Sequence, residues 1–183
     1  MLEITIPARE LYDQLNQEFI EQPEVKLVLE HSLVSLSKWD SKWEIPFLSD
    51  DPRTDEQTID YIRMMDLSPD TPDHAFDRLT DEIIEQVSNY LNAKMTATWF
   101  NEPKKPSRRK EVITAEIIYH WMIALSIPFE CQHWHLSRLL TLIKVCNEKN
   151  TPEKDRKKMS KSELAARNRS LNAQRRAQMK SSG

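Results

Sequence analysis

Glycine is almost missing from this chain: of its 183 residues only one is glycine, Gly183, in the last position. Glycine permits the positive φ angles and the close backbone approach on which phosphate-cradling loops, dinucleotide-binding turns and nucleophile elbows depend. The sequence therefore excludes these three kinds of site. Turns must be made by the ten prolines and by Asn, Asp and Ser, which favours a mainly α fold.

The segment 114–147 holds the longest helical pattern of apolar residues in the chain. Its first half repeats them at steps of three and four after Thr114, a suitable N-cap, and its second half continues the repeat. Pro128 lacks an N–H and biases Ile127 away from helical angles, so one helix cannot run through both halves. We therefore expect two helices that pack as a hairpin in the core.

The N-terminal region has a different pattern. Residues 2–6 alternate apolar and polar side chains up to Pro7, and residues 25–29 are similarly rich in β-forming residues, so we expect the two to pair as a small β-hairpin. The polar segment between them is too long for a tight turn. Residues 95–100 fit a short strand and a helix end equally well.

Three more helices are indicated by their starts. Ser32 can cap a helix that ends before Pro46, Thr54 has Gln57 three residues on as a capping-box partner, and Thr80 precedes two acidic residues. The first of these helices carries two tryptophans one turn apart. Such a pair is typical of a core or of an interface anchor.

Charge divides the chain in two. Residues 151–183 carry ten Lys and Arg against three carboxylates, a formal charge of +7; because the whole chain has −3, residues 1–150 have −10. The tail offers only Leu164 and Leu171 as large apolar side chains over five helical turns, too few to hold a helix in place. We therefore predict an acidic, mainly helical domain at 1–150 and a basic tail at 151–183 that forms a detached or partner-stabilised helix.

Cys131, His133 and His135 come closest to a metal-binding pattern. Zinc takes four tetrahedral ligands, usually in C-x-x-C or H-x-x-x-H pairs. Steps of two residues suit a strand or turn better than a helix, and a second pair of ligands is not visible. We predict no metal and no cofactor, while a metal at these three residues, or a Cys131 nucleophile beside a histidine, stays an alternative.

Catalysis has little support elsewhere. None of the 29 carboxylates stands apart from the charged helix faces as a base with a shifted pKa. We therefore predict a protein that is not an enzyme. The chain has no apolar run long enough for a membrane span and no secretory signal, and its two cysteines form no disulfide pattern, so we expect a cytoplasmic protein.

Two basic clusters remain, at 104–110 and in the tail, and they raise nucleic-acid binding as a hypothesis. The acidic body and the absence of aromatic residues among the tail charges argue against it. An Ala-rich basic helix suits docking on a protein, so a protein partner is favoured.

Several segments together resemble a family of small proteins encoded in the structural-gene region of long-tailed phages, some of which are labelled tail assembly chaperones. The resemblance covers nearly the whole chain and rests on residues 29–49 (LEHSLVSLSKWDSKWEIPFLS), 58–65 (TIDYIRMM), 95–100 (MTATWF), 113–147 and the closing MSKSELAARNRSLNAQRRAQ.

The resemblance implies a non-enzymatic role in the host cytoplasm, in which the protein keeps the long tape-measure protein soluble and passes it to tail-tube subunits. Two alternatives stay open: a structural virion component of the tail or head–tail joint, and a nucleic-acid-binding accessory protein that acts through the tail. A homo-oligomer is compatible with each. The candidate partner-binding residues are aromatic or basic: Trp39, Trp43, Arg108, Arg109, Arg167, Arg169, Arg175 and Arg176.

Overall fold

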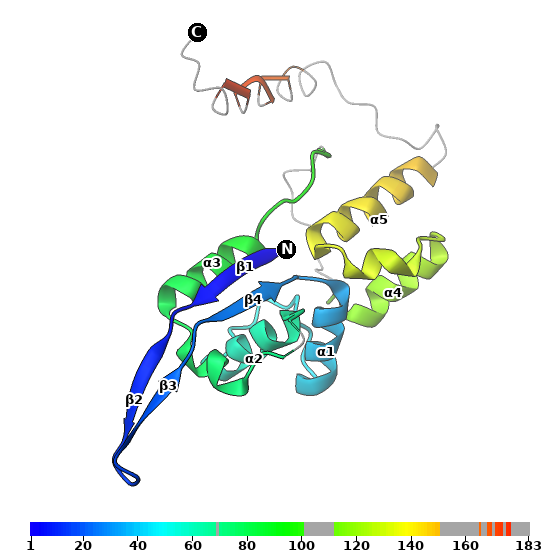
Figure 1. Ribbon diagram of the computed structural model, residues 1–183. Coiled ribbons are helices and arrows are strands. Elements are labelled where there is room, and N and C mark those ends of the chain that lie inside the picture. The colour runs from blue at the N-terminus through cyan, green and yellow to red at the C-terminus, as the bar shows by residue number, and fades with distance from the viewer. Residues whose placement is uncertain are drawn as a thin grey trace.

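The computed structural model (Figure 1) describes residues 1–68, 70–100 and 112–150, and a few positions between 165 and 176. These residues form a mainly helical body with a β ribbon at its N-terminal end, so the predicted fold class is confirmed at this level. The predicted basic helix of the tail lies largely outside the described residues. None of the described helices is long and apolar enough to cross a membrane.

The predicted N-terminal hairpin is present. Strand β1 (Leu2–Ile6) pairs antiparallel with β4 (Val25–Leu29), with Leu2 opposite Leu29 and Ile6 opposite Val25. Side chains alternate between the two faces of each strand, so Ile4 and Ile6 of β1 and Leu27 and Leu29 of β4 lie in the core.

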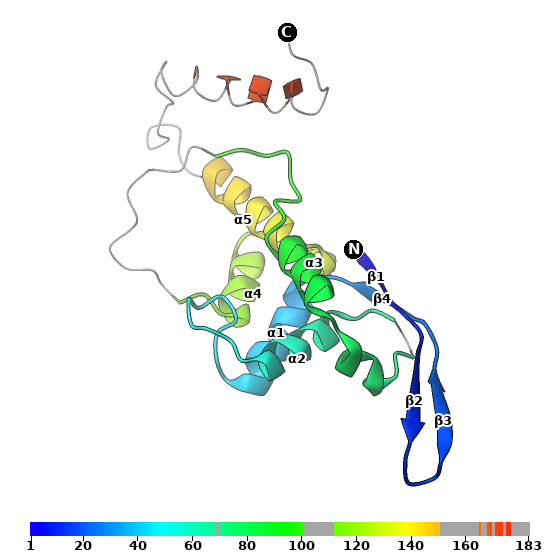
Figure 2. The same ribbon diagram turned by 90° about the vertical axis from the view of Figure 1, so that its left-hand side faces the viewer.

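The segment between these strands forms a second antiparallel pair, β2 (Arg9–Asp13) and β3 (Glu18–Gln22), which the sequence pattern did not predict. The two pairs follow one another along one ribbon, and Figures 1 and 2 show its β2–β3 part projecting from the body. Residues 9–22 are called the arm below.

Helices α1 (Leu33–Trp43), α2 (Asp55–Met65) and α3 (Asp81–Leu91) begin where their caps predict. The side chains of Ser32 and Thr54 each accept the N–H three residues on, in reciprocal capping boxes, while the Thr80 side chain accepts the N–H of Ile83 without a reciprocal bond. α1 packs on α2, and α3 packs on β1. A 3₁₀ helix, η1 (Asp73–Arg78), precedes α3.

The segment 114–147 breaks at Pro128 as predicted. Helix α4 (Ala115–Ala124) ends in a turn with Ser126 at φ 53°, and the 3₁₀ helix η2 (Phe129–His133) leads into α5 (Leu136–Asn150). The expected packing of the two helices as a hairpin needs correction, because α4 packs mainly on α1, and the residue before α5, His135, pairs with Ser32 just before α1. The N–H of Leu136 donates to His31 O at 2.7 Å, which attaches the start of α5 to the end of β4.

Residues 95–100 form neither a strand nor a helix, and Met95 has a φ of 47°. One hydrophobic core draws on β1, β4 and all five described α-helices. Its members with essentially no exposure include Ile6, Leu27, Leu29, Leu33, Leu36, Met65, Ile118, Met122 and Leu139.

Candidate interaction surface

The arm gathers apolar side chains that the body does not cover. Leu15 at its tip is 95% exposed, and the other four are between about a third and two thirds exposed: Leu11, Tyr12, Phe19 and Ile20. Scattered apolar residues on a surface are ordinary, but a contiguous group usually marks a site of interaction. The arm is therefore the first candidate for a binding surface.

Both faces of the arm are apolar near the tip. Leu11 lies opposite Ile20, and Tyr12 lies opposite Phe19 with their ring centroids 5.0 Å apart. Directly opposite residues share a face, and successive residues alternate between faces, so the two pairs lie on different faces. Each face of the arm therefore offers one apolar pair to a partner.

Acidic residues surround these apolar pairs. Glu10 lies opposite Glu21, and Asp13 lies opposite Glu18. With Arg9 as its one cation, the arm has a formal charge of −3. Like charges opposite one another destabilise a strand pair, so the arm favours a partner that brings positive charge.

The tip has a defined turn. Asp13 accepts hydrogen bonds from Leu15 N at 2.9 Å and from Asn16 Nδ2 at 2.8 Å, and Gln17 takes a φ of 55°. The bond from the Asn16 side chain, followed by those from the backbone, holds the pKa of Asp13 below its ordinary value. The carboxylate therefore stays charged beside the exposed Leu15.

Arg78 fixes the base of the arm. Its side chain is buried, and it donates to the carbonyl oxygens of Pro7 and, at 3.1 Å, of Pro23. These prolines stand between β1 and β2 and between β3 and β4, so one guanidinium joins both strands where the arm leaves the body. No sequence pattern indicates this role of Arg78, because its partners are backbone atoms far away in the chain.

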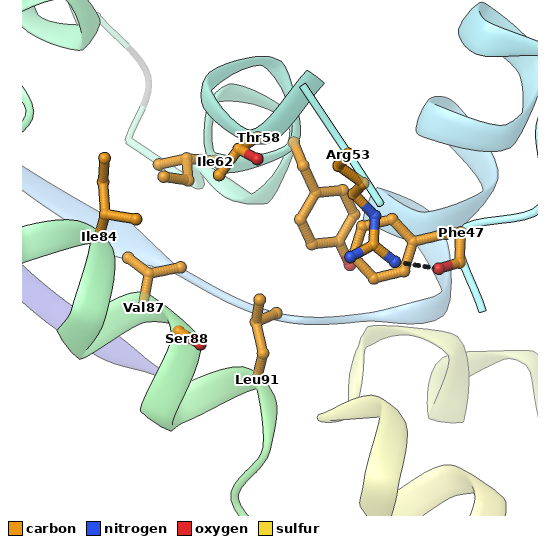
Figure 3. Close-up of a pocket in the computed structure, with 9 residues that line it drawn as sticks. Phe47, Arg53, Thr58, Ile62, Ile84, Val87, Ser88 and Leu91 are labelled. Carbon is orange, nitrogen blue, oxygen red and sulfur yellow. Dashed lines mark hydrogen bonds between the residues drawn. The ribbon is translucent and has the colours of Figure 1, made fainter. Parts of the chain in front are cut away.

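A pocket of about 210 Å³ lies between α2 and α3 (Figure 3). Thr58 and Ile62 of α2 face Val87 and Leu91 of α3 across it. Ile84 and Ser88 complete the α3 wall, and Phe47 and Arg53 close one end. Tyr61 also lines the pocket and stacks on Phe47. The lining is mainly apolar and contains no carboxylate.

The closed end of this pocket is an aromatic stack with a cation on it. The rings of Phe47 and Tyr61 stack with centroids 3.8 Å apart, and the guanidinium of Arg53 lies 4.0 Å from the Phe47 ring centroid. Arg53 also donates to Phe47 O. Among the described residues no carboxylate forms an ion pair with Arg53.

Behind the pocket lies a buried polar network. His31 Nδ1 is 2.5 Å from the hydroxyl of Tyr61, and the ring of His31 meets that of His135 edge to face at 5.2 Å. Tyr90 donates to Glu30 at 2.8 Å, and Glu30 also binds the N-terminal ammonium group at 3.2 Å. The network joins the end of β4 to α2, α3 and α5.

The pKa values in this network do not suit proton transfer near neutral pH. Burial, with a smaller effect of His135, lowers the pKa of His31 from 6.5 to about 3, and burial raises the pKa of Tyr61 above its ordinary value. A general acid or base works best with a pKa near the working pH. We therefore assign these residues to holding the fold together.

The two candidate tryptophans are not exposed anchors. Trp39 is 1% exposed, and its indole N–H donates to Gln57 O, so its prediction as a partner-binding residue is wrong for this structure. Trp43 is partly buried and donates to Asp60 Oδ2 at 2.9 Å, while Lys42 Nζ lies 2.8 Å from Asp60 Oδ1. Both tryptophans therefore join α1 to α2.

The basic candidates divide into two groups. Arg108, Arg109 and Arg167 lie outside the described residues. Arg169, Arg175 and Arg176 are described, exposed and in helical conformation. Their role as partner-binding residues stays a prediction.

The three candidate metal ligands, Cys131, His133 and His135, differ in their exposure to solvent. Cys131 and His135 are buried, whereas His133 is exposed, and the described part of the chain has no group of three or more potential ligands that could hold a metal. Burial raises the pKa of the Cys131 thiol, which disfavours the thiolate that a nucleophile requires.

Comparison of the chain with protein-family models, with curated proteins and with solved structures gave no match.

Proposed function

We propose that this protein is a non-enzymatic chaperone of phage tail assembly that binds the tape-measure protein. The phage setting and the identity of the partner come from the sequence resemblance. The observation that carries the proposal is the arm, which exposes apolar side chains on both faces at the end of a two-stranded ribbon.

The chemistry of the arm favours a protein over a nucleic acid. A formal charge of −3 repels phosphates, and three of the five exposed apolar residues, Leu11, Leu15 and Ile20, are aliphatic and do not stack on bases as aromatic rings do. A long helical protein with amphipathic helices exposes apolar stripes before it is assembled, and an arm that is apolar on both faces can insert between two such helices.

The basic tail has a separate part in this proposal. The basic tail at 151–183 recruits tail-tube subunits through Arg169, Arg175 and Arg176. This division places the tape-measure protein on the arm and the tail-tube protein on the tail.

Co-expression tests the proposal. We expect the tape-measure protein encoded in the same genome to become soluble when the wild-type chain is present. The double variant Tyr12→Ser/Phe19→Ser removes the aromatic pair and should lose most of this effect. Ile123→Ser is the matched control, because Ile123 is 63% exposed on α4, outside the arm.

Two results contradict the proposal. Either the wild-type chain leaves the solubility of the tape-measure protein unchanged, or the arm variant and the control behave alike. Mass spectrometry of purified particles separates the chaperone from the structural alternative, because a chaperone is absent from the finished virion.

A further inference from the structure

The pocket between α2 and α3 is too small for most small molecules. Sites for such ligands have volumes of roughly 300–1,000 Å³, whereas this pocket has about 210 Å³. Its mainly apolar walls leave room for one or two apolar side chains of a protein. The pocket therefore suits a protruding segment that ends in such side chains.

The arm is a segment of this kind. Leu15 stands at its tip with 95% of its surface exposed, and Asp13 and Glu18 flank the turn that carries it. The end of the pocket presents Arg53, which has no carboxylate partner among the described residues. Arm and pocket therefore match in size, in polarity and in the sign of their charges.

The arm cannot fill the pocket of its own chain. Figures 1 and 2 show it projecting away from α2 and α3, and Arg78 holds the two strands at its base. Pairing of two arms with each other is disfavoured, because Glu10, Glu21 and their neighbours would meet the same charges on the other arm. The pocket of a second copy avoids both obstacles: an arm that projects from its own body can reach it, and it presents Arg53 instead of a like charge.

We propose that, in the absence of a client, the arm of one copy docks in the α2–α3 pocket of a second copy. Leu15 enters the apolar part of the pocket, and Glu18 pairs with Arg53. The contact joins two different surfaces, so a pair held by one contact keeps one free arm and one free pocket, and further copies add head to tail into an open chain or close into a ring.

This self-association goes beyond the proposed function and does not depend on it. In a chaperone it covers the apolar tip of the arm until the tape-measure protein competes for it. Because self-association is measured on the protein alone, its failure and a failure of the co-expression test are separate results.

Sedimentation velocity over a series of protein concentrations tests the contact. We expect the wild-type chain to form species larger than a dimer as its concentration rises. Leu15→Ser on the arm and Ser88→Trp on the exposed wall of the pocket should each weaken association about tenfold or more, as expected for anchor residues. Ile123→Ser should associate as the wild type does.

A mixture of the two variants gives the sharpest result. The Leu15→Ser chain has an intact pocket, and the Ser88→Trp chain has an intact arm, so one good contact forms between them. We expect a one-to-one complex that grows no further. A wild-type chain that stays monomeric at every concentration, or a mixture that forms no complex, overturns the proposal.

Exchange of charges tests the predicted ion pair. Arg53→Glu and Glu18→Arg should each weaken association of the protein, and the double variant should restore it. Circular dichroism spectra equal to that of the wild type show that each variant is folded. If the double variant is weaker than both single variants, Glu18 and Arg53 do not meet and the proposed contact is wrong.

Discussion

Replacement of Arg78 by methionine tests how the arm is held. Methionine keeps an apolar stem of similar length and removes the two donors that reach Pro7 O and Pro23 O. The chain segments at the base of the arm then lose the group that joins them. We expect the arm to open more often while the core stays folded.

The magnitude follows from the two hydrogen bonds. Each bond from a charged donor contributes about 1.5–3 kcal/mol. Pro7 and Pro23 are exposed, so water can replace the lost donor at both carbonyls, and the cost of burying the guanidinium disappears with it. We therefore expect the whole substitution to cost about 1.5–3 kcal/mol, the contribution of one such bond.

Proteolysis under native conditions measures this loss. A protease that cuts after glutamate has sites in the arm at Glu10, Glu18 and Glu21. When the arm opens and closes quickly compared with cleavage, the cleavage rate is proportional to the fraction of molecules with an open arm. The expected loss of stability therefore corresponds to cleavage about 10- to 100-fold faster. Lys38→Met, which removes an exposed cation from α1, should be cut like the wild type. Equal cleavage rates for Arg78→Met and the wild type would refute the role of Arg78.

Three further predictions concern the body. Because burial keeps the pKa of His31 at about 3 in the fold, the unfolded chain binds the proton first, and stability should fall as the pH drops below about 6.5, with a slope that approaches about 1.4 kcal/mol per pH unit near pH 5. Urea unfolding should show this loss in the wild type and in the exposed control His120→Gln, and a smaller one in His31→Gln. Asp60→Ala removes the acceptor of Trp43 and Lys42 and should cost about 1–3 kcal/mol, seen as a lower urea midpoint. Trp39→Ala should cost about 3–5 kcal/mol in the same assay, and a loss below 1 kcal/mol would contradict its place in the core.

Local signals predicted much of the helical body. The caps at Ser32, Thr54 and Thr80 place three helix starts, because a side chain that accepts the N–H three residues on is a local device which needs no tertiary context. The pairing of residues 2–6 with 25–29 was also predictable, since one face of each strand is buried and the side chains alternate accordingly.

The arm was missed for the opposite reason. Residues 9–13 and 18–22 have both faces exposed, so burial imposes no alternation on them and the usual strand pattern is missing. The available signal was the continuation of the ribbon beyond Pro7 and Pro23, with Tyr12 and Phe19 at positions that pair when the antiparallel register is extended.

The two tryptophans also show what a sequence pattern cannot predict. A spacing of one helical turn places Trp39 and Trp43 on one face of α1, and it does not tell whether that face meets α2 or a partner. The answer comes from Asp60 and Gln57 of α2, which accept their indole N–H groups. Such long-range partners are set by the packing of helices and cannot be deduced from spacing.

Site-specific photo-crosslinking tests the central claim, that the arm is where protein partners bind. A photoreactive amino acid at position 15 lies at the tip of the arm, and one at position 123 is an exposed control on α4. In cells that also produce the tape-measure protein, we expect a crosslinked product with that protein from position 15 and not from position 123. The absence of any protein crosslink from position 15, or equal products from both positions, would contradict the claim.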